Sequence, residues 1–122
     1  MLDWYKKLYI GENAKKDAAR ARRRLNHGKL QMNMFLVTYA SNPENLFDII
    51  GTEQLLQKTL HRRCPMIIGL AASKEEAIQI VQQIIEETYA KQNDADVRRY
   101  LGERLLNKKE NIKQEKNKQE GE

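Results

Sequence analysis

Two short apolar segments constrain the fold of this chain more than any other feature. The first is "MNMFLVTYA", roughly residues 32–40, and the second is "MIIGLAA", residues 66–72. Both are nearly continuous apolar runs rather than alternating ones, which favours strands that are covered on both faces, as in a parallel sheet. The helix-patterned segment 41–65 has the length of a crossover connection, so we expect the two strands to be parallel and joined right-handedly. The sequence therefore predicts a small β-α-β core and an α/β fold.

Each predicted strand ends at a serine that a glutamate follows three residues later. Ser41 with Glu44, and Ser73 with Glu76, have the spacing of a capping box at the start of a helix. The first predicted helix is broken at Gly51 and carries four apolar residues in its first turns: Leu46, Phe47, Ile49 and Ile50. The second predicted helix, from residue 74 to about 89, has a broad apolar face that belongs against a sheet.

The flanking segments complete the predicted organisation. Residues 12–27 favour a basic helix that ends at Gly28 and has a narrow apolar stripe. The members of this stripe are Ala14, Ala18, Ala21 and Leu25. A further helix is expected after Asp94 or Asp96, either of which can cap it. Residues 107–122 contain Ile112 as their one large apolar residue, which is typical of a disordered tail. We therefore expect a single α/β domain over residues 1–106.

Two parallel strands alone make a poor sheet with two open edges. Either a third strand from residues 5–10 or the same sheet of a second copy of the chain could complete it. We prefer a homodimer as the interpretation of the incomplete sheet.

Composition places the chain among soluble proteins. The chain has 122 residues, of which 40% are hydrophobic and 32% charged. A single cysteine excludes an internal disulfide framework, and no apolar run is long enough to span a bilayer. The N-terminus lacks the apolar core of a signal peptide. We therefore expect a cytoplasmic protein without membrane contact.

The excess positive charge lies in one segment. Residues 15–24 carry six basic side chains against Asp17, while the rest of the chain has 16 basic and 16 acidic residues, so the net charge of +5 belongs to this segment. A local basic stripe indicates contact with phosphates, which would be salt-dependent and blind to sequence. The candidate nucleic-acid-binding residues are Lys15, Lys16, Arg20, Arg22, Arg23 and Arg24. A solvated helix face, or an acidic partner helix, explains the same pattern.

The carboxyl ends of two parallel strands would lie side by side, where open α/β folds often bind ligands. The candidate ligand-binding residues at this edge are Tyr39, Ser41, Asn42, Asn45, Ser73 and Lys74. They could hold a phosphorylated small molecule. The same residues are ordinary caps and turn formers, and neither junction has a glycine-rich phosphate loop, so capping is the favoured interpretation.

No segment predicts catalysis. Cys64 follows His61 with two arginines between them, and nearby cations could lower the pKa of its thiol, but isolated cysteines are usually inert packing residues. The spacings of His27, His61 and Cys64 match no zinc pattern. We expect no metal, no cofactor and no enzymatic activity.

Three segments in a fixed order carry a resemblance: "WYKKLYIGENAKK", "YASNPENLFDII" and "IIGLAASKEEAIQIVQQIIEE". This order resembles a family of short bacterial proteins without assigned function, over residues 1–105 or so. The resemblance implies no activity, cofactor or partner. Our first hypothesis is a non-enzymatic protein-interaction or adaptor module that acts as a homo-oligomer. The alternatives are a nucleic-acid-binding accessory protein and a sensor of small phosphorylated ligands.

Overall fold

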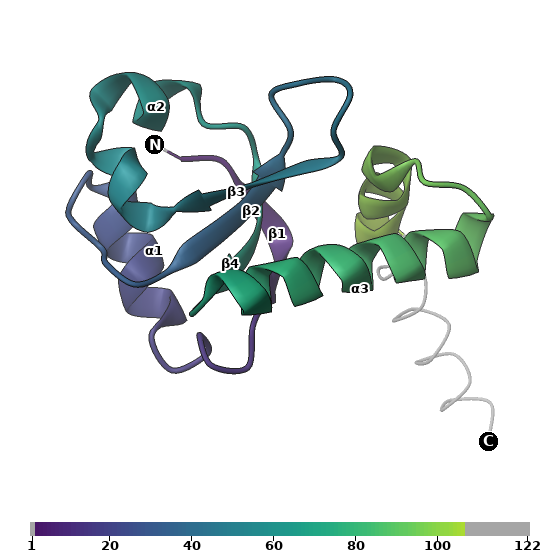
Figure 1. Ribbon diagram of the computed structural model, residues 1–122, viewed down its shortest axis with the longest axis horizontal. Coiled ribbons are helices and arrows are strands. Elements are labelled where there is room, and N and C mark those ends of the chain that lie inside the picture. Colours follow the sequence, from purple (N-terminus) through teal and green to yellow (C-terminus); the bar gives the residue numbers. More distant parts are fainter. Residues whose placement is uncertain (1, 107–122) are drawn as a thin grey trace, which may run out of the picture. The chain divides into compact units, whose positions relative to one another are not determined.

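The computed structural model describes residues 2–106 (Figure 1). Its elements are β1 (Trp4–Ile10), α1 (Ala18–Asn26), β2 (Phe35–Tyr39), β3 (Phe47–Gly51), the 3-10 helix η1 (Thr52–Leu56), α2 (Lys58–Arg63), β4 (Ile67–Ala71) and α3 (Lys74–Gln92). Residues 97–106 form a further helix. The chain divides into two compact units with a boundary between Gln83 and Ile84, inside α3. The tail predicted for residues 107–122 lies outside the described residues.

The four strands form one mixed sheet in the order β1-β4-β2-β3. The α/β class is confirmed, and the third strand that residues 5–10 could supply is present as β1, which pairs with β4 in parallel. The predicted parallel pairing of the two apolar strands is wrong. β2 and β4 are antiparallel, with Leu36 opposite Leu70, and β2 is also antiparallel to β3.

β2 and β4 are antiparallel because the segment between them does not form the predicted crossover helix. Segment 41–50 forms a hairpin loop and β3, so the chain has already reversed direction when it leaves Gly51. η1 and α2 then carry the chain past β2 to β4, which runs in the same direction as β3. The apolar residues of segment 46–50 fit a helical turn by spacing alone. In the fold they pair with β2 instead, where Ile49 lies opposite Val37.

Polar groups close the hairpin between β2 and β3. The backbone N–H of Glu44 donates to Asn42 Oδ1 at 3.0 Å, and that of Asn45 donates to the Asn42 carbonyl at 3.0 Å. The N–H and hydroxyl of Ser41 donate to Asp48 Oδ2 at 3.1 and 3.2 Å. Ser41 therefore closes a turn, and the helix start predicted there is wrong.

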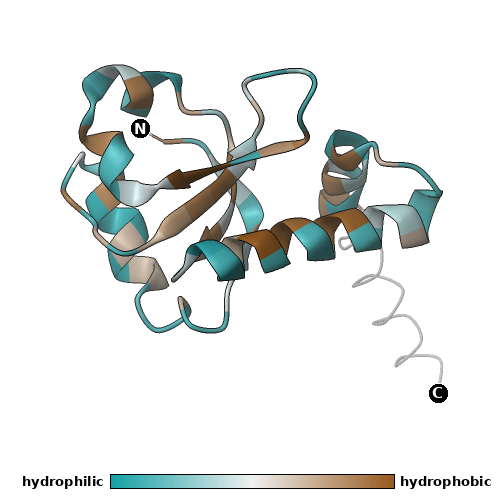
Figure 2. Ribbon diagram, in the orientation of Figure 1, coloured by the Kyte–Doolittle hydropathy of each residue, from teal (hydrophilic) through white to brown (hydrophobic). Residues whose placement is uncertain are grey.

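The helix of the basic segment is shorter than predicted, because residues 12–17 form turns and α1 begins at Ala18. Its predicted apolar stripe is buried in the hydrophobic core cluster. Figure 2 shows hydrophobic colours along β2 and on part of α1. This cluster includes Ala14, Ala18, Ala21, Leu25, Leu36, Ile67 and Leu70. The start of α3 packs where Gly69 lacks a side chain, and a Cβ there would come 3.0 Å from Ile80 Cγ2.

The buried carboxylate of Glu76 joins the loop after β1 to the junction between β4 and α3. It accepts from the N–H and side-chain amide of Asn13 at 3.1 and 2.8 Å, and from the N–H of Ala72 at 2.9 Å. A Cβ on Gly11 would overlap this carboxylate. Ser73 Oγ accepts from the N–H of Glu76 at 3.1 Å, so the predicted cap at this junction is confirmed.

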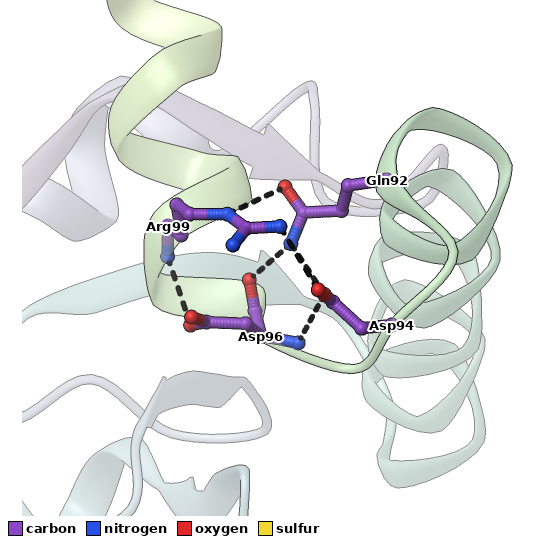
Figure 3. A network of polar contacts seen from close by, with 4 residues as sticks. All are labelled: Gln92, Asp94, Asp96 and Arg99. Atoms are coloured by element: carbon purple, nitrogen blue, oxygen red, sulfur yellow. Dashed lines mark hydrogen bonds and ion pairs between the residues drawn. The ribbon is translucent and has the colours of Figure 1, made fainter.

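The second unit carries a polar network where its two helical segments meet (Figure 3). Asp96 caps the second segment, since its Oδ1 accepts from the N–H of Arg99 at 3.2 Å. Asp94 accepts from the N–H of Asp96 and from Gln92 Nε2 at 3.0 and 2.7 Å, and its Oδ2 pairs with Arg99 at 2.9 Å. Hydrogen bonds from Asp96 first, and then from Gln92, lower the pKa of Asp94.

Candidate anion-binding groove

A groove of about 600 Å³ lies in the first unit, between the end of α1 and the η1–α2 segment. The helices that border it lie at the left of Figure 1. The lining residues are Asn26, His27, Gly28, Leu55, Leu56, Lys58, His61 and Arg62. We call this set the basic groove.

The end of α1 forms one wall because the chain turns sharply there. Gly28 adopts a left-handed conformation with φ of 69°, as predicted for a helix cap. Its N–H donates to the Leu25 carbonyl at 3.1 Å, and the N–H of Lys29 donates to the Arg24 carbonyl at 2.9 Å, which makes a Schellman motif. The carbonyls of Arg24 and Leu25 in the last turn of α1 are thus already hydrogen-bonded. They present less free negative charge to the groove than an open helix end does.

His61 joins the two walls of the groove. Its Nε2 lies 2.9 Å from the carbonyl oxygen of Leu25, 36 residues away in the sequence. Because a carbonyl can only accept, Nε2 carries the proton in this contact. The bond holds α2 against the end of α1, and the half-buried Leu60 of α2 packs against the core cluster as well.

The charge of the basic groove has one sign. Lys58 and Arg62 are exposed and positively charged at neutral pH, and no carboxylate is among the lining residues. Two leucines form its apolar part, of which Leu55 is buried and Leu56 is 49% exposed. The groove therefore suits an anion that brings phosphates to its cations.

The cations predicted to contact nucleic acid are all exposed, but several have local partners. Lys15 pairs with Glu12, and Arg20 pairs with Asp17, at 2.9 and 3.0 Å. Exposed pairs of this kind contribute little to stability and can exchange partners.

Two of the arginines on α1 have structural contacts. Arg22 lies over the ring of Trp4 at 5.0 Å, and Arg24 donates twice to the Leu30 carbonyl, at 3.0 and 2.7 Å. Lys16 and Arg23 complete the predicted set and are exposed. The predicted residues are thus distributed around α1 and its preceding turns rather than gathered in the groove.

The residues predicted to bind a phosphorylated small molecule are not brought together. Tyr39, Ser41, Asn42 and Asn45 lie at or just beyond the carboxyl end of β2, where it forms the hairpin with β3. Ser73 and Lys74 follow the carboxyl end of β4. Because β2 and β4 are antiparallel neighbours, their carboxyl ends lie at opposite ends of the strand pair, as the pairing of Phe35 with Ala71 shows.

Other candidate chemistry is limited. Cys64 packs against the core cluster, and burial raises the pKa of its thiol, which opposes formation of a thiolate at neutral pH. Within residues 2–106, no group of three or more potential metal ligands is found. In the same range, no helix has the length and apolar character needed to cross a membrane.

Sequence reasoning missed Lys58 and Arg62 as groove residues. The signal that could have indicated them is the basic pattern of "KTLHRR" at residues 58–63. In the sequence its arginines point first to an effect on the pKa of the neighbouring Cys64 thiol. The position of this segment beside the end of α1 depends on long-range packing and on the bond from His61 to Leu25. Comparisons with family models, curated proteins and solved structures give no match.

Proposed function

We propose that this protein is a non-enzymatic nucleic-acid-binding accessory protein that contacts phosphates through the basic groove. The observation that supports the proposal is a groove with two exposed cations and no carboxylate among its lining residues. Phosphate contacts supply most of the affinity of sequence-independent binding.

A polyanion fits this surface better than a small phosphorylated molecule. The groove lacks a glycine-rich loop of backbone N–H groups that could enclose a single phosphate. Its cations, Lys58 and Arg62, are long side chains carried by the same short helix, α2. Such a surface matches a row of phosphates along a strand.

The test is a salt titration of binding to random duplex DNA and to RNA, with the wild-type protein and Lys58→Ala/Arg62→Ala. We expect the double variant to bind more weakly, and the slope of log K against log salt to fall by about 2, since each phosphate contact accounts for about one unit. The matched control is Lys6→Ala/Lys91→Ala, which removes the same charge from two exposed sites on β1 and α3.

An equal loss of affinity in both double variants would show that binding depends only on the net charge of the protein. That result would contradict a role for the basic groove. Absence of wild-type binding to either nucleic acid at low salt would reject the proposal altogether. Urea unfolding of each variant separates loss of binding from loss of fold.

The homo-oligomeric interaction module is a second candidate. An incomplete sheet no longer supports it, because four strands make an adequate sheet. The feature that favours it is the edge strand β3, which carries half-buried Phe47 and Ile49 and has neither lysine nor proline to protect it.

A further inference from the structure

Both histidines of this chain line the basic groove. His27 lies at the end of α1, and His61 lies in α2. Histidine is the only side chain whose ordinary titration changes its charge between about pH 5 and pH 8. Any imidazole of this protein that gains a proton therefore adds its charge to the groove that we propose as the phosphate site.

The contact of His61 with the Leu25 carbonyl leaves one ring nitrogen for a second proton. Nε2 already carries a proton in this contact, 2.9 Å from the carbonyl oxygen. A proton that the ring gains in acid therefore binds Nδ1, and it does not displace the bond that joins α2 to α1. The charged ring also donates a stronger hydrogen bond than the neutral ring does. Protonation of His61 thus adds a charge to the groove and keeps its two walls together.

His27 can also gain a charge without loss of a structural contact. It is exposed, and its backbone N–H completes the last turn of α1 by donating to the carbonyls of Arg23 and Arg24, at 3.3 and 3.2 Å. The contacts that end the helix here are thus made by the backbone. The ring lines the groove and is accessible both to protons and to a ligand.

The charged side chains of the helices that border the groove are basic, with one exception. α1 carries four arginines, and α2 carries Lys58, Arg62 and Arg63. The exception is Glu53 of η1, which is not among the lining residues. Lys58 and Arg62 are neighbours of His61 on α2 and line the groove with it, so a proton on His61 brings like charges together. An anion in the groove removes this repulsion.

The other titratable groups near these elements do not offset the charge of the imidazoles. Asp3 and Asp17, which precede β1 and α1, are not among the lining residues, and Asp17 pairs with an arginine of α1. β1 itself contributes two lysines. Cys64 ends α2, and burial raises the pKa of its thiol, so this group is uncharged at neutral pH. Phosphate is therefore the group that can compensate two imidazolium charges in the groove.

We infer that the basic groove is a proton-dependent phosphate site, in which protonated His27 and His61 join Lys58 and Arg62 as cations that contact a nucleic-acid backbone. The affinity then rises as the pH falls, because phosphodiesters stay ionised while the cations that line the groove increase from two to four. Binding takes up protons, since a bound phosphate favours the charged form of each ring. The inference rests on the proposed function, because it assigns a regulation to the same groove.

The test repeats the salt titration with random duplex DNA and RNA at about pH 8 and about pH 5.5, between which imidazoles change from mostly neutral to mostly charged. For the wild type, we expect affinity to rise roughly tenfold or more at low pH, and the slope of log K against log salt to steepen by about 2, because two further cations contact phosphates. His27→Gln/His61→Gln should bind as the wild type does at the higher pH and should show no rise. Glutamine keeps an N–H that can donate to the Leu25 carbonyl. Lys6→Ala/Lys91→Ala is the matched control, and it should keep the full rise.

His27→Gln alone provides a second variant, because it leaves the bond from His61 to Leu25 in place. About one unit of the steepening is expected to remain in it. Urea unfolding at the higher pH identifies any variant that has lost its fold. Wild-type affinity and salt slope that are equal at the two pH values would overturn the inference and leave the proposed function in place. A rise that persists unchanged in both histidine variants would overturn it as well, while absence of binding at either pH would reject the proposed function and this inference with it.

Discussion

Two junctions of this chain share a sequence signature and fold differently. Ser41 and Ser73 both follow a strand, and a glutamate lies three residues after each. The first junction is a hairpin in which the hydroxyl of Ser41 donates to Asp48. The second is a helix start in which Ser73 accepts from the N–H of Glu76. The serine–glutamate spacing therefore does not decide which structure forms. The residues that follow the glutamate decide it.

The difference lies in the partner that each segment finds. After Glu76, the apolar positions Ala77 and Ile80 are buried, as helical spacing against a sheet requires. After Glu44, the apolar residues of segment 46–50 lie in a strand that pairs with β2. The Glu76 carboxylate also accepts hydrogen bonds from Asn13, 63 residues away in the sequence, while the backbone N–H of Glu44 donates to its near neighbour Asn42.

The largest expected difference between the junctions concerns the two glutamates. Glu76→Ala leaves three N–H groups without their acceptor and should lower the free energy of unfolding by about 3 kcal/mol. Glu44→Ala should change it by less than about 0.5 kcal/mol, because Glu44 is exposed. Urea unfolding of both variants measures the comparison. Similar losses at the two positions would show that the contacts of Glu76 do not set the second junction apart.

A variant of Gly11 sharpens the comparison, because it tests the site of the Glu76 carboxylate. Gly11→Ala places a methyl group where that carboxylate lies, and it should lower the free energy of unfolding by about 2 kcal/mol. Once Glu76 is replaced by alanine, the added methyl group has space, so most of this loss should disappear. A double-mutant cycle measures the coupling. Simple additivity would contradict the proposed overlap.

The smallest expected difference concerns the two serines. Ser73→Ala should lower the free energy of unfolding by about 1 kcal/mol, since it removes a helix cap. Ser41→Ala should cost less than about 0.5 kcal/mol, because the backbone N–H of Ser41 keeps its bond to Asp48. Thermal unfolding of the two variants compares them. A larger loss at Ser41 would mean that its hydroxyl sets the hairpin.

Sequence alone was sufficient for features that depend on near neighbours. The alanine stripe of α1, the left-handed Gly28 and the cap at Ser73 were all predicted, since each depends on spacing within a few residues. The hairpin was not predicted, because the pattern of residues 46–50 satisfies one turn of helix as well as one strand. Only the presence of β2 beside it distinguishes the two.

None of the six cations that the sequence predicts to contact nucleic acid lines the basic groove. The concentration of charge before and within α1 is evident from the sequence, and His27 was noted there only as a possible metal ligand. The basic groove also needs Lys58 and Arg62, which are more than 30 residues from α1 and approach it through the bond from His61 to Leu25. Local patterns contain no information on such an approach. Strand direction also cannot be read from local patterns. For this reason the predicted ligand-binding set combined residues after β2 with residues after β4, which the antiparallel pairing separates.

The sheet order has a consequence for the way the chain reaches its fold. β1 is synthesised first, yet β4, its only partner strand among the described residues, is the last strand to be made and inserts between β1 and β2. While β4 is still missing, β1 has no ladder to join, and β2 and β3 are the only strands that can pair. Folding must therefore wait for a contact that spans some 60 residues, between Tyr9 and Gly69, and such late, long-range closure makes for a slow final step.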